Sequence, residues 1–251
     1  MESHTGKVAK QFGAVAEAYL SSPVHSQGMD LEAIADRLRN GSEATVLDLG
    51  CGAGHLSFAI ASHVQSVVAY DLSAEMLDMV ANEAKRRSLR NVSTQQGNVD
   101  ELPFESASFD WVCSRYSAHH WTEIRKAFSE VRRVLKPGGG LILVDVCAPA
   151  NPLLDTHLQT IELLRDVSHV RDYTITEWHS LLAEAEFEVG EQHTWKLPLD
   201  FKAWVGRMKT PTVYVEAIRS LLQSAPREVR DYFLVAEDGS FVPDAVLIEA
   251  S

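Results

Sequence analysis

Three glycines within five residues follow a short apolar segment, and this feature constrains the fold more than any other in the chain. The segment 45–49 runs into Gly50-Cys51-Gly52-Ala53-Gly54, and the apolar residues at 56–60 indicate a helix directly afterwards. Glycines at a strand–helix turn let a ligand approach the backbone closely, and the following helix N-terminus offers free N–H groups. The spacing differs from the dinucleotide pattern Gly-x-Gly-x-x-Gly, because His55 stands where the third glycine belongs. The turn therefore predicts a ligand site and disfavours a dinucleotide.

Short apolar strands and amphipathic helices alternate as far as residue 148. Further strands are expected at 67–70, 92–96, 109–113 and 141–144, and helices at 31–38, 73–87 and 124–135. This alternation is typical of a parallel sheet covered on both faces, and right-handed crossovers make such a sheet doubly wound. The sequence therefore predicts a Rossmann-like α/β fold with its core at 40–148.

The remainder of the chain departs from this alternation. Helical spacing recurs at 154–164, 178–185 and 200–223, a strand is expected at 187–195, and the segments 232–236 and 245–249 flank the turn pair Asp238-Gly239. We interpret 151–175 and 197–230 as helical insertions around the last two strands. With a lid segment at 5–28, they complete a single domain that spans 1–251.

Composition limits the class of partner. The chain has 251 residues and a formal net charge of −12. Nucleic-acid binding requires clustered Lys and Arg, whereas the densest basic stretch, 85–90, falls at a predicted helix end and complements the helix dipole. A small-molecule partner is therefore favoured, and no nucleic-acid partner is expected.

Metal binding, secretion and membrane insertion are also not expected. The cysteines Cys51, Cys113 and Cys147 form no Cys-x-x-Cys pair, and no cluster of His, Asp and Glu has metal-ligand spacing. No apolar window reaches the length of a membrane span, and the first residues lack the pattern of a signal peptide. We therefore expect a cytoplasmic protein without a metal.

Two polar positions follow the second and third strands. Asp71 ends the second strand, where an acidic side chain can accept hydrogen bonds from both ribose hydroxyls; alternatively, it caps the helix that begins near Ser73. The segment 96–104 follows the third strand, where a polar side chain and a backbone N–H can read an adenine edge; alternatively, it is a plain turn. Together with the glycine turn, these positions favour an adenosine-containing ligand.

Four motifs in register give a specific resemblance. With Phe109-Asp110-Trp111-Val112, His119-His120-Trp121 and the segment 133–139, these positions resemble the class I S-adenosylmethionine-dependent methyltransferases of the ubiquinone/menaquinone-biosynthesis type over residues 8–148. The whole chain, including its tail, resembles uncharacterised bacterial methyltransferases of that group. The resemblance implies a seven-stranded sheet with an antiparallel strand among the last two, and S-adenosylmethionine as the cofactor.

The resemblance carries cofactor contacts over to individual positions. Gly50, Cys51 and Gly52 match the backbone beside the methionine part, and Asp71 matches the ribose ligand. Asn98 matches an adenine contact that the family often makes with Asp, and an Asn side chain still offers an acceptor. The residues matched to the cofactor are Tyr19, Asp48, Gly50, Cys51, Gly52, Asp71, Leu72, Met76, Asn98, Val99, Ser114 and Arg115.

Acceptor recognition is expected from the segments 5–28 and 151–175. The candidate acceptor contacts are Phe12, Arg165, His169 and Arg171, and the candidate catalytic bases are His25, His119, His120 and His169. Alternatively, Phe12, Ala16 and Tyr19 form one amphipathic helix face. The arginines, likewise, would form surface ion pairs with Glu162, Asp166 or Asp172.

The reaction expected is C- or O-methylation ahead of N-methylation. After the fourth strand, residues 114–117 read Ser-Arg-Tyr-Ser. Amino-group methyltransferases of DNA and some proteins resemble one another in having an Asn/Asp-Pro-Pro-Tyr run at this place. Its absence here argues against methylation of DNA or protein amides. Two other functions stay open, a non-catalytic S-adenosylmethionine-binding protein and an NAD(P)-dependent oxidoreductase.

Overall fold

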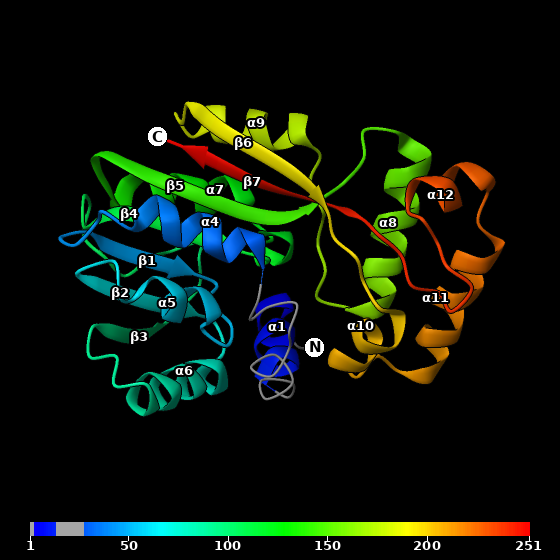
Figure 1. Cartoon of the computed structure of the whole chain (residues 1–251), viewed down its shortest axis with the longest axis horizontal. Helices are drawn as coiled ribbons and strands as arrows, with labels where there is room; N and C mark the ends of the chain where they lie inside the picture. The colour runs from blue at the N-terminus through cyan, green and yellow to red at the C-terminus, as the bar shows by residue number, and fades with distance from the viewer. Residues whose placement is uncertain (1–2, 14–27) are drawn as a thin grey trace.

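A seven-stranded sheet forms the centre of the protein. The computed structural model describes residues 3–13 and 28–251, and the strand order is β3-β2-β1-β4-β5-β7-β6 (Figure 1). Only β7 runs antiparallel to its neighbours, β5 and β6. The strands are β1 (Thr45–Leu49), β2 (Ser66–Asp71), β3 (Val92–Gln96), β4 (Phe109–Arg115), β5 (Leu135–Cys147), β6 (Val189–Lys196) and β7 (Asp244–Ala250). The predicted doubly wound α/β fold with an antiparallel last strand is confirmed.

Helices cover both faces of this sheet. The helices are α1 (His4–Gly13), α4 (Met29–Leu38), α5 (His55–Ile60), α6 (Ala74–Arg86), α7 (Ile124–Val134), α8 (Pro152–Arg165), α9 (Ile175–Glu184), α10 (Phe201–Arg207), α11 (Thr212–Ser224) and α12 (Arg227–Tyr232), with the 3₁₀ turn η1 (Ala118–His120). Val46 of β1 packs with residues of α4 and α5, whereas the next residue, Leu47, packs with residues of α7 and α9. Successive side chains of a strand point to opposite faces, so a strand buried on both sides is mainly apolar, and in β1 the buried exception is Asp48.

Strand β5 begins earlier than the sequence predicts. Leu135 already pairs with Phe109 of β4, and the ladder resumes where Gly140 pairs with Trp111. A side chain at Gly140 would lie 2.3 Å from the Trp111 ring, so only glycine lets the strand pass this indole. The segment 232–236 differs too, because Tyr232 ends α12 and no strand follows before Asp244.

The helices α8, α10, α11 and α12 form a second packed cluster at one end of the sheet (Figure 1). Trp204 of α10 contacts Phe241, with ring centroids 4.9 Å apart, and Leu158 of α8 and Ile218 of α11 are fully buried within the same cluster. These helices derive from the segments 151–175 and 197–230. Helix α1 lies between this cluster and the sheet in the view of Figure 1.

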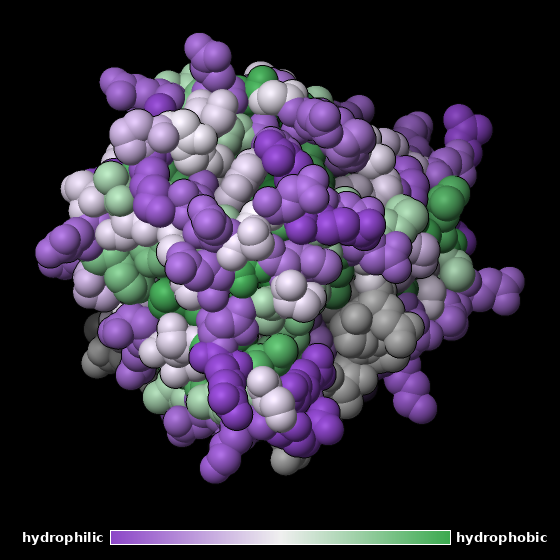
Figure 2. Space-filling model, turned by 60° about the vertical axis from the view of Figure 1, so that its left-hand side comes forward, coloured by the Kyte–Doolittle hydropathy of each residue, from purple (hydrophilic) through white to green (hydrophobic). Residues whose placement is uncertain are grey.

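The visible surface is largely polar. On the face that Figure 2 shows, hydrophilic side chains predominate and hydrophobic ones form small separate groups. Among the described residues, no helix combines the length and the apolar character that crossing a membrane requires.

Candidate active site

A cavity opens at the carboxyl edge of the parallel strands, as expected for a doubly wound sheet. We call it the first cavity. It is lined from β1, β2, β4, the loops that follow β1 and β3, and helix α1. Ten of the residues predicted to contact the cofactor line it: Asp48, Gly50, Cys51, Gly52, Asp71, Leu72, Met76, Asn98, Val99 and Arg115. The structure does not bring Ser114 to this lining, because its side chain is buried within β4, and Tyr19 lies outside the described residues.

The glycine turn after β1 forms one wall of the first cavity. The N–H groups of Gly50 and Cys51 donate to the carbonyl of Tyr70 at 2.8 and 3.0 Å, which fastens the turn to β2. Gly50 and Gly52 have φ values of +73° and +50°, in a backbone region that residues other than glycine rarely adopt. A Cβ atom on Gly52 would meet no atom within 4 Å, so the backbone here borders open space.

Asp71 holds the same turn from β2. Its carboxylate accepts hydrogen bonds from the N–H groups of Gly52 at 2.8 Å and Ser73 at 2.9 Å. Burial raises the pKa of Asp71, and these backbone hydrogen bonds oppose the rise. The cap of α6 is Ser73, whose hydroxyl accepts from the N–H of Met76 at 3.2 Å. Asp71 therefore supports the turn while lining the cavity.

Asp48 and Arg115 bring buried charge to the floor of the cavity. The Asp48 carboxylate accepts from the N–H and the hydroxyl of Ser57 at 2.9 and 2.6 Å, and burial raises its pKa to about 6. Arg115 forms an ion pair with Asp30 of α4, and both side chains are buried. Helix α4 is thereby joined to the end of β4.

The loop after β3 supplies the opposite wall. The Asn98 side chain bonds to Asp100, through its amide nitrogen at 3.1 Å and its oxygen at 3.3 Å, and the Tyr70 hydroxyl donates to the Asn98 carbonyl. These bonds fix the turn and leave Asn98 and Val99 on the cavity surface.

A second cavity lies between the sheet and the helical cluster. It is lined by Phe12, Tyr116, His119, His120, Val146, Glu162, Arg165, Asp172, Leu197, Leu199, Trp204 and Arg207. Phe12, Tyr116 and His120 line both cavities, so these three rings form their common boundary. Tyr116 has a φ of +51° and donates its N–H to Val144 at 2.8 Å, so its ring is held at the boundary by an uncommon backbone conformation.

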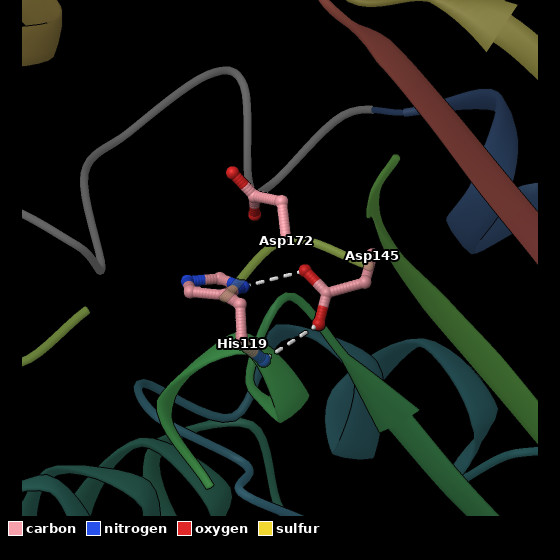
Figure 3. Close-up of side chains that lie close together, drawn as sticks. All are labelled: His119, Asp145 and Asp172. Carbon is pink, nitrogen blue, oxygen red and sulfur yellow. Dashed lines mark hydrogen bonds and ion pairs between the residues drawn. The ribbon is translucent and has the colours of Figure 1, made fainter. Parts of the chain in front are cut away.

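His119 and Asp145 form a hydrogen-bonded pair beside the second cavity (Figure 3). The Asp145 carboxylate contacts His119 Nδ1 at 2.6 Å and accepts from the His119 backbone N–H at 3.1 Å. Asp172 lies close enough that one ligand atom from each of the three residues falls within 4.8 Å of the others. The hydrogen bonds between Asp145 and His119 are the direct contacts within this buried group.

The predicted tail residues have different surroundings. Arg165 lines the second cavity and donates to the Trp204 carbonyl at 3.1 Å. His169 is buried, contacts Gln159 through Nε2 at 2.9 Å and lines neither cavity. Arg171 also lines neither cavity and pairs with Asp155 and Glu177, not with the acids that the ion-pair alternative named, whereas Arg165 does pair with Glu162. His25 lies outside the described residues.

Several lining residues were not singled out from the sequence. Tyr116 and Ser117 follow β4 directly, so their place at the carboxyl edge could have been inferred from strand order alone. His4, Thr5 and Val8 of α1 also line the first cavity. Helix α1 falls almost entirely within the segment 5–28, which the sequence predicted as a lid, whereas no sequence pattern connects Asp145, inside an apolar strand, to His119.

The comparisons identify the family. Residues 47–143 match the methyltransferase domain. The chain is 51% identical over 201 residues to the uncharacterised protein YafE of Escherichia coli, covering 80% of this chain and 97% of that protein. It is 36% identical over 243 residues to the uncharacterised methyltransferase YcgJ of Bacillus subtilis, covering 95% and 96%. The chain belongs to the class I S-adenosylmethionine-dependent methyltransferases.

Structure and more distant relatives agree with this membership. The crystal structure of YcgJ superposes with a TM-score of 0.84 at 35% identity, over 88% of this chain and 97% of that chain. The ubiquinone/menaquinone biosynthesis C-methyltransferase UbiE of Rhizobium etli is 34% identical over 153 residues, covering 59% of each protein. The predicted family, enzyme class and cofactor are therefore confirmed. The open space beside Gly52 and the carboxylate of Asp71 fit an adenosylated amino acid.

Proposed function

We propose that this methyltransferase acts on a small molecule bound in the second cavity, with C- or O-methylation ahead of N-methylation. The observation that carries the proposal is the shared boundary of the two cavities at Phe12, Tyr116 and His120. Methyl transfer requires donor and acceptor to meet in line within contact distance. A cofactor in the first cavity and an acceptor in the second would meet at this boundary.

We assign the first cavity to S-adenosylmethionine. The glycine turn would hold the methionine part, Asp71 the ribose, and Asn98 with Val99 the adenine edge, while Leu72 and Met76 pack beside the base. When bound, S-adenosylmethionine supplies a methyl group that is already activated. The protein's contribution is then to position the acceptor and to exclude water.

We assign the helices α8, α10, α11 and α12 to a substrate cap and α1 to an N-terminal lid. The cap contributes Glu162 and Arg165 from α8, and Trp204 and Arg207 from α10, to the second cavity. Helix α1 has no buried residue but places Phe12 against His120, with ring centroids 5.0 Å apart. A helix held by so few buried contacts can move to admit ligands.

The charge around the second cavity disfavours a cationic amine as the acceptor. Arg165 and Arg207 are permanently charged. Both guanidinium groups repel an ammonium group. UbiE, a distant relative, is a C-methyltransferase by name, which supports C-methylation as one of the two favoured reactions.

Turnover with deuterated S-adenosylmethionine tests the proposal. The purified protein would be incubated with small phenols, 1,3-dicarbonyl compounds, carboxylic acids and amines, and the methylated carbon, oxygen or nitrogen would be identified by mass spectrometry and NMR. Val146→Phe, which narrows the second cavity, should abolish turnover while S-adenosylhomocysteine still binds. Val213→Phe, at an exposed position of α11, is the matched control and should behave as wild type. Turnover that survives Val146→Phe would contradict the acceptor site.

A further inference from the structure

Two adjacent histidines stand where the cavities meet. The rings of His119 and His120 lie 4.2 Å apart, and both side chains are largely buried. His120 lines both cavities, whereas His119 lines only the second. Two imidazoles this close disfavour simultaneous protonation, so the groups around them decide which one carries the charge.

His119 is surrounded by acids. Asp145 of β5 engages Nδ1, which leaves Nε2 on the side of the ring away from Asp145 (Figure 3). Glu162 of α8, and Asp172 and His169 of the segment after α8, also face it. Burial alone would lower the pKa of His119, but Asp145, Asp172 and Glu162 together raise it to about 9. At neutral pH His119 is therefore an imidazolium, and its Nε2–H is a donor.

His120 has the opposite surroundings. Its Nδ1 lies 3.0 Å from the Ser168 carbonyl, which can only accept, so Nδ1 carries the proton and Nε2 keeps a lone pair. Burial and the neighbouring charge of His119 lower its pKa to about 4, against the attraction of Asp166 and Asp145. The Asp166 carboxylate lies 3.9 Å from Nε2 and would stabilise a proton taken up there.

We propose that His119 and His120 form an acid–base pair that selects an acceptor with an acidic hydroxyl or an enolisable C–H group. His120 Nε2 removes the proton, and the electron pair of the broken O–H or C–H bond stays on the acceptor. The negative charge of the acceptor, together with Asp166, offsets the repulsion between the two protonated rings. His119 Nε2–H stabilises the negative oxygen of the resulting oxyanion or enolate. The electron pair on that oxygen (O-methylation), or on the enolate carbon (C-methylation), would form the new bond to the methyl carbon, and the carbon–sulfur pair would stay on sulfur. Neighbouring titratable groups whose surroundings give them very different proton affinities are suited to act as an acid and a base. The inference rests on the proposed acceptor site.

Asp145 and Asp166 are positioning residues in this arrangement. Asp145 fixes the His119 ring and its charge, and Asp166 itself is held by the N–H and hydroxyl of Ser168 at 2.8 and 2.5 Å. The segment that carries Asp166 and Ser168 is anchored to η1, because Val170 and Arg171 donate their N–H groups to the His119 carbonyl at 2.9 and 3.1 Å. His119 and His120 are therefore held in place by Asp145 of β5 and by the segment after α8.

The first test reads the two protonation states directly. NMR of ¹⁵N-histidine-labelled full-length protein with S-adenosylhomocysteine would be recorded from acid to alkaline pH, with His119→Gln and His120→Gln assigning the signals. His119 should stay doubly protonated until pH approaches about 9, and His120 should stay neutral with the proton on Nδ1 down to about pH 4. His179→Gln, at an exposed histidine of α9, is the control. A neutral His119 or a charged His120 at pH 7 would overturn the proposal, and so would stoichiometric Zn²⁺ binding to His119.

The second test uses 4-nitrophenol, whose anion is coloured, as a probe of the acceptor site. In the complex with S-adenosylhomocysteine it should bind as the phenolate at a pH where it is neutral in solution. His119→Gln should weaken this binding by about tenfold or more, through loss of a charge-assisted hydrogen bond. A probe that does not bind, or binds as the neutral phenol, overturns the acceptor class. If the probe binds and Val146→Phe leaves its binding intact, the acceptor site itself is wrong; if only His119→Gln is without effect, this inference alone fails.

Discussion

The Asp145 carboxylate holds His119 at two points, the ring Nδ1 at 2.6 Å and the backbone N–H at 3.1 Å. Asp145 is fully buried on β5, whereas His119 belongs to the 3₁₀ turn η1 that follows β4. The contact therefore ties the loop at the boundary of the two cavities to the centre of the sheet. It also makes the stability of the fold depend on the charge of one imidazole.

Stability should fall between pH 6.5 and 9 because of His119. Its pKa in the folded protein is raised to about 9 from 6.5, so its contribution is complete below pH 6.5 and is lost as pH rises through 9. The loss should be on the order of 3 kcal/mol. Urea unfolding of wild type and His119→Gln across this range checks it. A difference between the two proteins that grows with pH would mean that His119 is neutral in the fold.

Asp71→Ala should weaken S-adenosylhomocysteine binding by about tenfold to a hundredfold, because charge-assisted hydrogen bonds are worth about 1.5–3 kcal/mol. Asp71→Asn should lose less, since an amide oxygen still accepts. Calorimetry measures both affinities. Asp78→Ala, at an exposed position of α6, is the control. Unchanged affinity in a folded Asp71→Ala protein would remove Asp71 from the ribose site.

Gly52→Val should abolish the thermal stabilisation by S-adenosylhomocysteine, because the side chain would enter the space that borders the glycine turn. Gly138→Val provides a matched control. Gly138 also has a positive φ, +79°, and also faces open space, but it does not line either cavity. Both variants should lose stability through backbone strain, and only Gly138→Val should keep the thermal shift. Equal thermal shifts in both variants would contradict a ligand at the turn.

Asp30→Ala should destabilise the fold by about 3–5 kcal/mol, because it leaves the buried guanidinium of Arg115 without its carboxylate. Asp36→Ala on the same helix removes an exposed partner of Arg39 and should cost less than about 1 kcal/mol. Urea unfolding compares the two variants. Equal losses would show that the Arg115–Asp30 pair contributes no more than a surface ion pair.

Helix α1 should become more protected from hydrogen exchange when S-adenosylhomocysteine binds. His4, Thr5, Val8 and Phe12 line the first cavity, yet no residue of α1 is buried without a ligand. Residues 4–13 would be compared with α11, which lines neither cavity and should be unchanged. Protection that is the same with and without ligand would argue against α1 as a lid.

The sequence by itself determined the parallel part of the sheet and most of the lining of the first cavity. Glycine spacing, short apolar strands and the polar residues that follow them are local patterns. Parallel strands bring their carboxyl ends to one edge, so Gly52, Asp71 and Asn98 could be predicted to meet without knowledge of any long-range contact. Ser114 was predicted at this cavity and lies buried instead, because alternate residues of β4 point to opposite faces.

Only the tertiary structure decided where the second cavity lies and which side chains face it. Its lining comes from segments far apart in the chain, including α1, η1, β5, α8 and α10, and no periodicity specifies how these segments pack together. Asp145 shows why. In the sequence it is one acidic residue inside an apolar strand, and its partner His119 becomes apparent only when β4 and β5 pair. Hydrophobic burial is non-directional and sets which residues are inside, whereas the partner of a buried charge depends on the exact packing.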